Sequence, residues 1–212
     1  MTNRPRRNRV TPTGEIVASP ERGRAMGNRG ALVDATGEVV RDWLHKRWIC
    51  CTLREVHGRR LRFDDPQKYT PLFFTDEAVA LAAGHRPCGS CRPDAYYRWL
   101  AIWRRLSGHS KFERVRPHTM DLDLHAHRSK RLLLPTRLED LAAGSFVMLS
   151  DISAQPMLIF EGRLWPWRDC AYAAPIIIDR TLKEATAQPF LFSEYLMEGY
   201  RFDEEMAPLP GY

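Results

Sequence analysis

The feature that most constrains this chain is the run GHRPCGSCRPD at residues 84–94, in which Cys88 and Cys91 flank a turn containing a glycine. Such a turn, called a knuckle, aims two sulfurs at one tetrahedral metal ion, and zinc is the usual ion for paired thiolates. The competing interpretation is a pair of small, buried apolar side chains. We predict zinc at Cys88 and Cys91, with further ligands supplied from elsewhere in the chain.

The five cysteines favour metal binding over disulfide formation. Their number is odd, and the N-terminus carries no apolar segment of the kind that directs secretion, so we expect a cytoplasmic protein with reduced thiols. In that compartment a Cys-x-x-Cys pair indicates a metal or redox site. A thioredoxin-type redox site is disfavoured because a helix, and not a strand, is predicted directly before the pair.

The neighbouring cysteines Cys50 and Cys51 lie in a predicted strand at residues 47–53. Successive side chains of a strand point to opposite faces, so only one of these two sulfurs can easily reach the knuckle. Cys51 is our choice, because Ile49, Cys51 and Leu53 then share a face. The fourth ligand is expected to be a histidine or the other cysteine.

Residues 75–83 followed by the knuckle resemble the second half of the zinc domain of the Ada family of DNA methylphosphotriester repair proteins. In that family an aromatic-flanked strand leads into a short alanine-rich helix and then a G-F-R-P-C-x-x-C knuckle with Pro-Asp after it. The resemblance spans about 20 residues and implies a cysteine-ligated zinc domain that docks on DNA. It transfers ligation to Cys88 and Cys91, and also to Cys51. The remainder of the chain resembles uncharacterised bacterial proteins, which imply no activity.

Basic charge is concentrated around the predicted zinc site. Residues 1–62 carry 14 Lys and Arg against 6 Asp and Glu, and residues 63–138 carry 13 against 8. Residues 139–212 carry 5 against 12. Most of the basic residues are arginines, which make bidentate contacts to phosphate, so the charge favours nucleic acid as the partner. DNA is favoured over RNA, and the candidate phosphate contacts are Arg47, Arg59, Arg60, Arg86 and Arg92.

The expected fold class is α+β, with three regions. Residues 1–30 are predicted to be a basic N-terminal arm, residues 31–138 the zinc-binding region, and residues 139–212 a β-rich acidic region packed on it. Helices are predicted over residues 75–83, 93–106 and 119–134, and two more over 181–188 and 190–198. A tight turn at Glu161-Gly162 is expected to join two strands.

The helix at 119–134 carries candidate chemistry. Asp121 and His125 are one turn apart, so the carboxylate can orient the imidazole for metal ligation or for proton transfer. His125 is the first candidate for the missing zinc ligand, and His118 is the alternative. If Asp121 and His125 act on a phosphodiester beside a metal ion, the chain is instead a metal-dependent nuclease.

Two further functions stay open. Cys50 or Cys51, activated as a thiolate on zinc, is a candidate alkyl acceptor. Alternatively the zinc is purely structural, and the acidic C-terminal region meets a basic protein partner. The sequence has no glycine-rich phosphate loop, no repeat and no long apolar segment, so no nucleotide cofactor and no membrane association are predicted.

Overall fold

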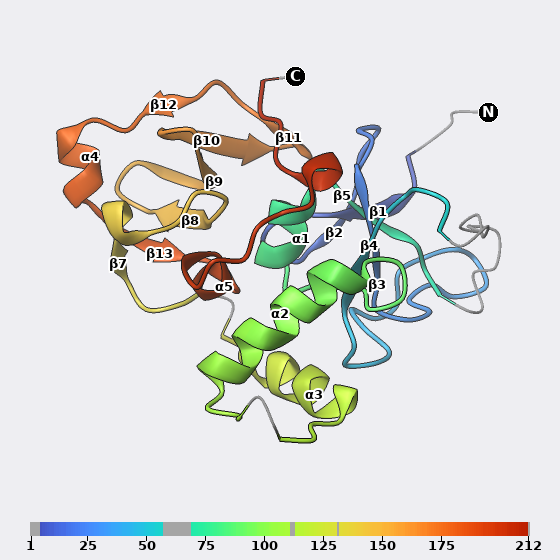
Figure 1. Cartoon of the computed structure of the whole chain (residues 1–212). Coiled ribbons are helices and arrows are strands. Elements are labelled where there is room, and N and C mark those ends of the chain that lie inside the picture. Colours follow the sequence, from blue (N-terminus) through green and yellow to red (C-terminus); the bar gives the residue numbers. More distant parts are fainter. Residues whose placement is uncertain (1–4, 57–68, 111–112, 131, 212) are drawn as a thin grey trace.

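The computed structural model describes residues 5–56, 69–110, 113–130 and 132–211 (Figure 1). Within these residues the chain has an α+β fold with two β-sheets, and the C-terminal part is rich in strands, as predicted. One sheet is built from the N-terminal half and the other from the C-terminal half. A short helix lies between them, and two longer helices pack below it in the view of Figure 1.

The N-terminal sheet contains six strands within the described part of the chain. They are β1 (Arg7–Val10), β2 (Ile16–Ala18), β3 (Ala25–Asn28), β4 (Ile49–Cys51), β5 (Leu72–Phe74) and β6 (Arg86–Pro87). Their order is β2-β1-β5-β3-β4-β6. β5 is parallel to β1 and antiparallel to β3, and β6 is parallel to β4. Three of the strands, β1, β2 and β3, come from residues 1–30, the predicted basic N-terminal arm.

The C-terminal sheet is antiparallel throughout. Its strands in the described chain are β7 (Thr136–Arg137), β8 (Phe146–Leu149), β9 (Ser153–Phe160), β10 (Arg163–Arg168), β11 (Ala171–Tyr172), β12 (Ile176–Ile177) and β13 (Thr186–Pro189). The order is β11-β10-β9-β8-β13-β7, and β12 pairs with β10. Glu161 and Gly162 join β9 to β10 with positive φ angles of 50° and 70°. This is the predicted tight turn, and its geometry suits the twist of the two strands.

The helices are α1 (Glu77–Ala82), α2 (Pro93–Leu106), α3 (Pro117–Arg128), α4 (Arg180–Glu184) and α5 (Ser193–Met197), with 3-10 turns at Leu138–Asp140 and Glu204–Met206. Pro93 begins α2 because proline tolerates the first helical position. Trp99 and Trp103 are buried, and the Trp99 ring stacks on Tyr195 of α5 at 3.8 Å between centroids. None of the helices in the described residues has the length and apolar character needed to cross a bilayer.

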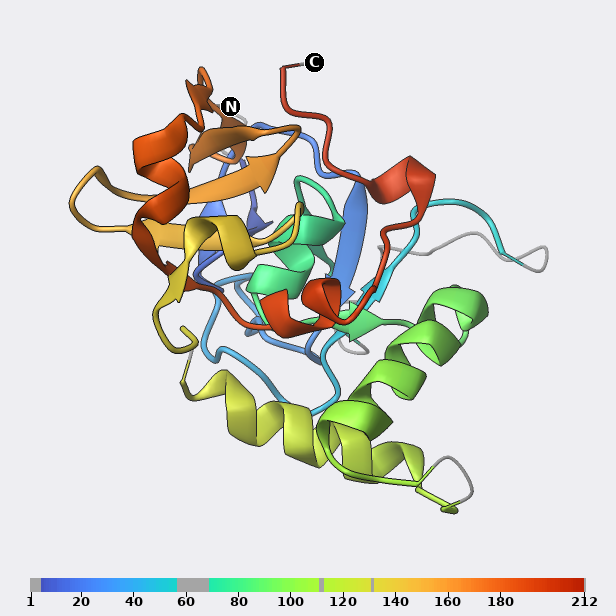
Figure 2. The same cartoon turned by 60° about the vertical axis from the view of Figure 1, so that its left-hand side comes forward.

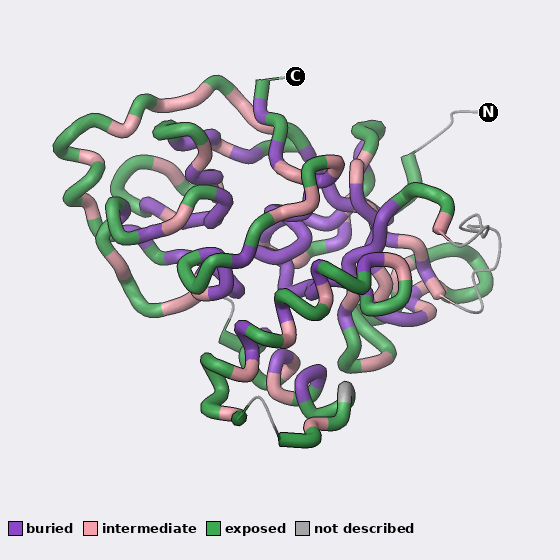
Figure 3. Tube along the Cα trace, in the orientation of Figure 1, coloured by how far each residue is buried: buried purple, intermediate pink, exposed green. Residues whose placement is uncertain are grey.

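Helix α1 is buried along its whole length and joins the two sheets (Figures 2 and 3). Asp76 caps it by accepting a hydrogen bond from the Val79 backbone N–H at 3.0 Å. Its side chains share one apolar cluster with Phe74 of the N-terminal sheet and Phe146 of the C-terminal sheet. Small alanine side chains allow this close packing on both sides. The two halves of the chain are therefore held by a common core.

Candidate metal centre and nucleic-acid interface

Three cysteines form a candidate metal centre. The sulfurs of Cys51, Cys88 and Cys91 all lie within 4.8 Å of one another. Cys51 ends β4, and the other two lie on the turn between β6 and α2. The parallel pairing of β4 with β6 places them together, and the Cys88 backbone N–H donates to the Cys50 carbonyl at 2.9 Å. The predicted meeting of Cys51 with the knuckle is confirmed, and this cluster can hold a metal ion.

The cluster lies in a mostly apolar setting with Met26, Ile49, Tyr69 and Phe73 around it. Hydrogen bonds from the Cys51 and Cys91 thiols lower the pKa of Cys88, whereas the pKa of Cys51 is raised well above its ordinary value by the same contacts. The three thiols are thus close enough to hydrogen-bond to one another. A soft divalent cation that displaces those protons would have three sulfur ligands.

Cys50 lies on the opposite face of β4, as the strand alternation predicts. It is fully buried in the main core cluster and is not part of the three-sulfur group. Burial raises the pKa of its thiol, so the side chain is an inert apolar group. The structure thus places Cys50 away from the three-sulfur group, and its role as a catalytic nucleophile stays a prediction.

Helix α3 does not bring His125 to the sulfurs. Among the described residues no histidine or carboxylate joins the three cysteines. His125 packs instead against Trp43, with 4.6 Å between ring centroids, and His118 is exposed in the first turn of α3. The reason is a salt bridge one turn earlier that fixes how α3 packs. His125 is therefore not part of the three-cysteine group in this structure.

That salt bridge joins Asp121 of α3 to Arg86 of β6. The Arg86 Nε and Nη2 atoms donate to the two carboxylate oxygens at 2.8 and 2.9 Å, and both side chains are buried. Both oxygens of the Asp121 carboxylate are thus bound to Arg86 in the protein interior. His125, one turn later in α3, packs against Trp43. Asp121 therefore pairs with Arg86 in this structure, whereas its catalytic pairing with His125 stays a prediction.

The predicted phosphate-binding arginines separate into three groups. Arg86 and Arg92 are buried, and Arg92 pairs with Glu77 and Asp203 at 2.7 Å each. Neither guanidinium faces solvent in this structure. Arg47 is exposed, as a phosphate contact must be. Arg59 and Arg60 lie outside the described residues.

The acidic C-terminal segment pairs with several arginines of the same chain. Ion pairs connect it to arginines of the first two thirds of the sequence: Arg54–Glu205, Arg92–Asp203, Arg98–Asp203 and Arg105–Glu198. In addition, Arg24 donates to the backbone carbonyls of Glu205 and Ala207 at 2.7 Å. Net charge therefore overstates the number of cations available to a partner.

The segment at residues 41–47, which we call the basic rim, carries three exposed cations. Arg41, Lys46 and Arg47 are exposed there, and no carboxylate of the described chain pairs with them. Trp43 and Leu44 are 41% and 52% exposed in the same segment. Aromatic residues interleaved with basic ones are a sequence signal for nucleic-acid contact, and sequence reasoning used only Arg47 from it.

Comparison with protein-family models, with curated proteins and with solved structures gives no match for this chain. What it binds must therefore be inferred from its own side chains. Those side chains supply three cysteine sulfurs within reach of one ion, and exposed cations beside an exposed tryptophan.

Proposed function

We propose that the chain is a zinc-binding protein that binds nucleic acid, with DNA favoured over RNA. The observation that carries the proposal is the cluster of Cys51, Cys88 and Cys91. The local resemblance of residues 75–94 to the zinc domain of the Ada repair proteins supports the choice of DNA and a role in DNA repair or processing. The basic rim supplies the surface for phosphate contacts.

Zinc is proposed as the ion because thiolates are soft ligands and three of them favour zinc among the common divalent metals. Bound there, the ion would tie the end of β4 to the start of α2. Its contribution would be to stability, since ligands that are separated in the unfolded chain make metal binding part of the folding free energy.

Metal content per chain, measured on protein purified without chelator, tests the zinc site. Wild type is expected to hold one zinc, and Cys51→Ser, Cys88→Ser and Cys91→Ser are expected to lose it. Cys50→Ser is the matched control on the other face of β4 and should retain the metal, as should His125→Ala. Zinc retained by Cys88→Ser, or no metal in the wild type, would refute the proposed site.

Nucleic-acid binding is proposed at the basic rim because exposed, unpaired cations beside an exposed aromatic ring suit the sugar-phosphate backbone and the bases. Binding driven by phosphate contacts releases counterions, so its affinity must fall steeply with salt. A rim with three free cations predicts a modest but measurable salt slope.

The salt dependence of binding to a single-stranded DNA oligomer tests this interface. Lys46→Gln and Arg47→Gln are each expected to reduce the slope of log K against log salt by about 1. The control is Arg105→Gln, since this arginine is already paired with Glu198 and should leave the slope unchanged. A slope near zero for the wild type would reject phosphate binding, and RNA of equal length tests the preference for DNA.

A further inference from the structure

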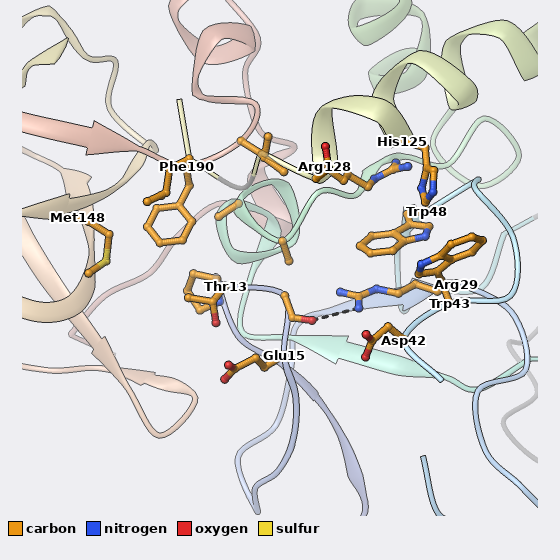
Figure 4. A pocket seen from close by; sticks show the side chains of 17 residues that line it. Thr13, Glu15, Arg29, Asp42, Trp43, Trp48, His125, Arg128, Met148 and Phe190 are labelled. Carbon is orange, nitrogen blue, oxygen red and sulfur yellow. Dashed lines mark hydrogen bonds between the residues drawn. The ribbon is translucent and has the colours of Figure 1, made fainter. Parts of the chain in front are cut away.

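A cavity of about 750 Å³ lies beside the basic rim (Figure 4). None of the three clustered cysteines lines it. Apolar side chains such as Met148 and Phe190 form one wall, and the other wall carries Arg29, Trp48 and Arg128. The volume is within the usual range for pockets that hold a small organic ligand.

Arg128 presents an unsatisfied cation to this cavity. Its side chain is only 7% exposed, and its Nε and Nη1 atoms donate to the carbonyls of Gly84 and Lys46 at 2.7 and 2.8 Å. The Nη2 atom is buried and has no hydrogen-bond partner among the described residues. No carboxylate of the described chain pairs with the group, and burial lowers its pKa to about 9. An oxyanion at Nη2 would satisfy both the charge and the donor.

A second guanidinium lies on the same indole ring. The Arg29 Cζ atom is 4.0 Å from the centroid of the Trp48 ring, and the Arg128 Cζ atom is 4.8 Å from it. Arg29 donates to His85 Nε2 at 3.1 Å, and burial lowers the pKa of His85 well below its usual value, so this neighbour is neutral. An anion bound beside Trp48 would therefore lie close to two guanidinium groups.

Other features of the cavity fit a flat ring with polar edges. Trp43 stands 41% exposed at the cavity, and its ring meets His125 edge to face. The His125 Nδ1 and Trp48 Nε1 atoms are buried without partners among the described residues. The exposed carboxylates of Glu15 and Asp42 also line the cavity, where they can accept hydrogen bonds from ring N–H groups and disfavour a second phosphate.

We infer that this cavity binds one unpaired nucleotide, with its phosphate at Arg128 and its base beside Trp43. The choice of a nucleotide rests on the proposed nucleic-acid function, whereas the oxyanion site rests on Arg128 and its surroundings. The same chemistry is present in a free nucleoside monophosphate and in a nucleotide of a single strand, and the two sources are separated by the experiment.

The experiment is a titration of the full chain, followed by tryptophan fluorescence and calorimetry. The probes are the four deoxynucleoside 5′-monophosphates, inorganic phosphate, a single-stranded oligomer, and the same oligomer with abasic sites in place of its bases. We expect saturable binding of at least one monophosphate, and of the intact oligomer about tenfold more tightly than the abasic one. Phosphate alone should compete weakly.

Trp43→Ala is expected to remove that tenfold preference, and Arg128→Gln to abolish monophosphate binding. Trp43 is largely at the surface, so its removal keeps the inference testable if Arg128→Gln does not fold. Tyr97→Ala, which removes a ring 65% exposed on α2, is the matched control and should change nothing.

The outcomes are distinct for the two proposals. Equal affinity for intact and abasic oligomers, together with no binding of any monophosphate, overturns the cavity inference while leaving backbone binding intact. Monophosphate binding without binding of either oligomer supports the cavity and identifies the free nucleotide as its ligand, and it refutes the nucleic-acid function. No binding of any probe overturns both.

Discussion

Two neighbouring carboxylates, Asp76 and Glu77, connect the start of α1 to the far end of the chain. Asp76 accepts a hydrogen bond from the Tyr172 hydroxyl at 2.6 Å, and Glu77 accepts one from Tyr200 at 2.7 Å in addition to its Arg92 contact. Burial raises the pKa of Asp76 to about 6 and also raises that of Glu77. Buried charges of this kind are tolerated only because every carboxylate has partners.

Glu194 differs, because its Oε2 atom is buried without a partner among the described residues. Burial raises its pKa to about 7. The folded protein therefore holds this proton more tightly than the unfolded chain does. The stability that the protonated group contributes is complete below pH 4.5, the ordinary value, and is lost as the pH rises to about 7.

Glu194→Gln is accordingly expected to match wild type at pH 4 and to exceed it at pH 8 by up to about 3 kcal/mol in the free energy of unfolding. Urea unfolding at the two pH values measures the difference. A difference between the proteins that does not change with pH would show that Glu194 is ionised in the folded state as readily as in the unfolded one.

The Arg86–Asp121 ion pair links β6 to α3 across the protein interior. Asp121→Asn leaves the Arg86 guanidinium buried without its counter-charge, which is expected to cost about 3 to 5 kcal/mol of stability. The double variant Arg86→Met with Asp121→Leu removes both charges and should recover most of that loss. Chemical denaturation of the two variants checks the prediction, and a double variant as unstable as the single one contradicts it.

Prediction from sequence succeeded for elements with local signals. The helix predicted over residues 93–106 is α2 (Pro93–Leu106), which begins at a proline and buries Trp99 and Trp103. Helix α1 begins at Glu77 because Asp76, and not Thr75, provides the cap. Helix α3 covers Pro117–Arg128, starting earlier and ending earlier than predicted, since Pro117 takes the first helical position.

Elements that depend on distant partners were not predictable. Residues 186–188 were expected to be helical but belong to β13, because Gln188 and Pro189 pair with Met148 and Val147. The basic segment at residues 7–28 forms strands for the same reason, since Arg9 of β1 pairs with Phe73 of β5 and Gly27 of β3 pairs with Leu72 of β5, which are 64 and 45 positions later. Local propensity carries no information about such pairing.

The metal centre was predicted better than its surroundings. Alternation along one strand identified Cys51 over Cys50, because side-chain direction is a local property. Whether an arginine reaches solvent depends on residues that are distant in the sequence. Arg86 and Arg92 were predicted to contact phosphate, but in the folded chain they pair with carboxylates of other elements. The sequence shows which residues are charged, but it does not show which oppositely charged residue each one meets in the folded chain.

At the scale of the whole molecule, α1 gives the two sheets one apolar core. Val79→Ala removes buried methyl groups where both sheets meet, and is expected to reduce stability by about 2 kcal/mol. The unfolding of both halves should still follow a single transition, seen at the same midpoint by far-UV circular dichroism and by tryptophan fluorescence. Two separate midpoints would mean that each half has an independent core.

The central position of β5 also has a consequence for the chain as it is synthesised. β1 with β2, and β3 with β4, emerge from the ribosome as two separate pairs, and neither has its inner neighbour until residues 72–74 follow. Until then each pair of strands has an exposed edge with unpaired backbone N–H and C=O groups, which can hydrogen-bond to a strand of another chain. Molecular chaperones, or slow dilution in refolding, are therefore expected to raise the yield of this protein most when they act before β5 is in place.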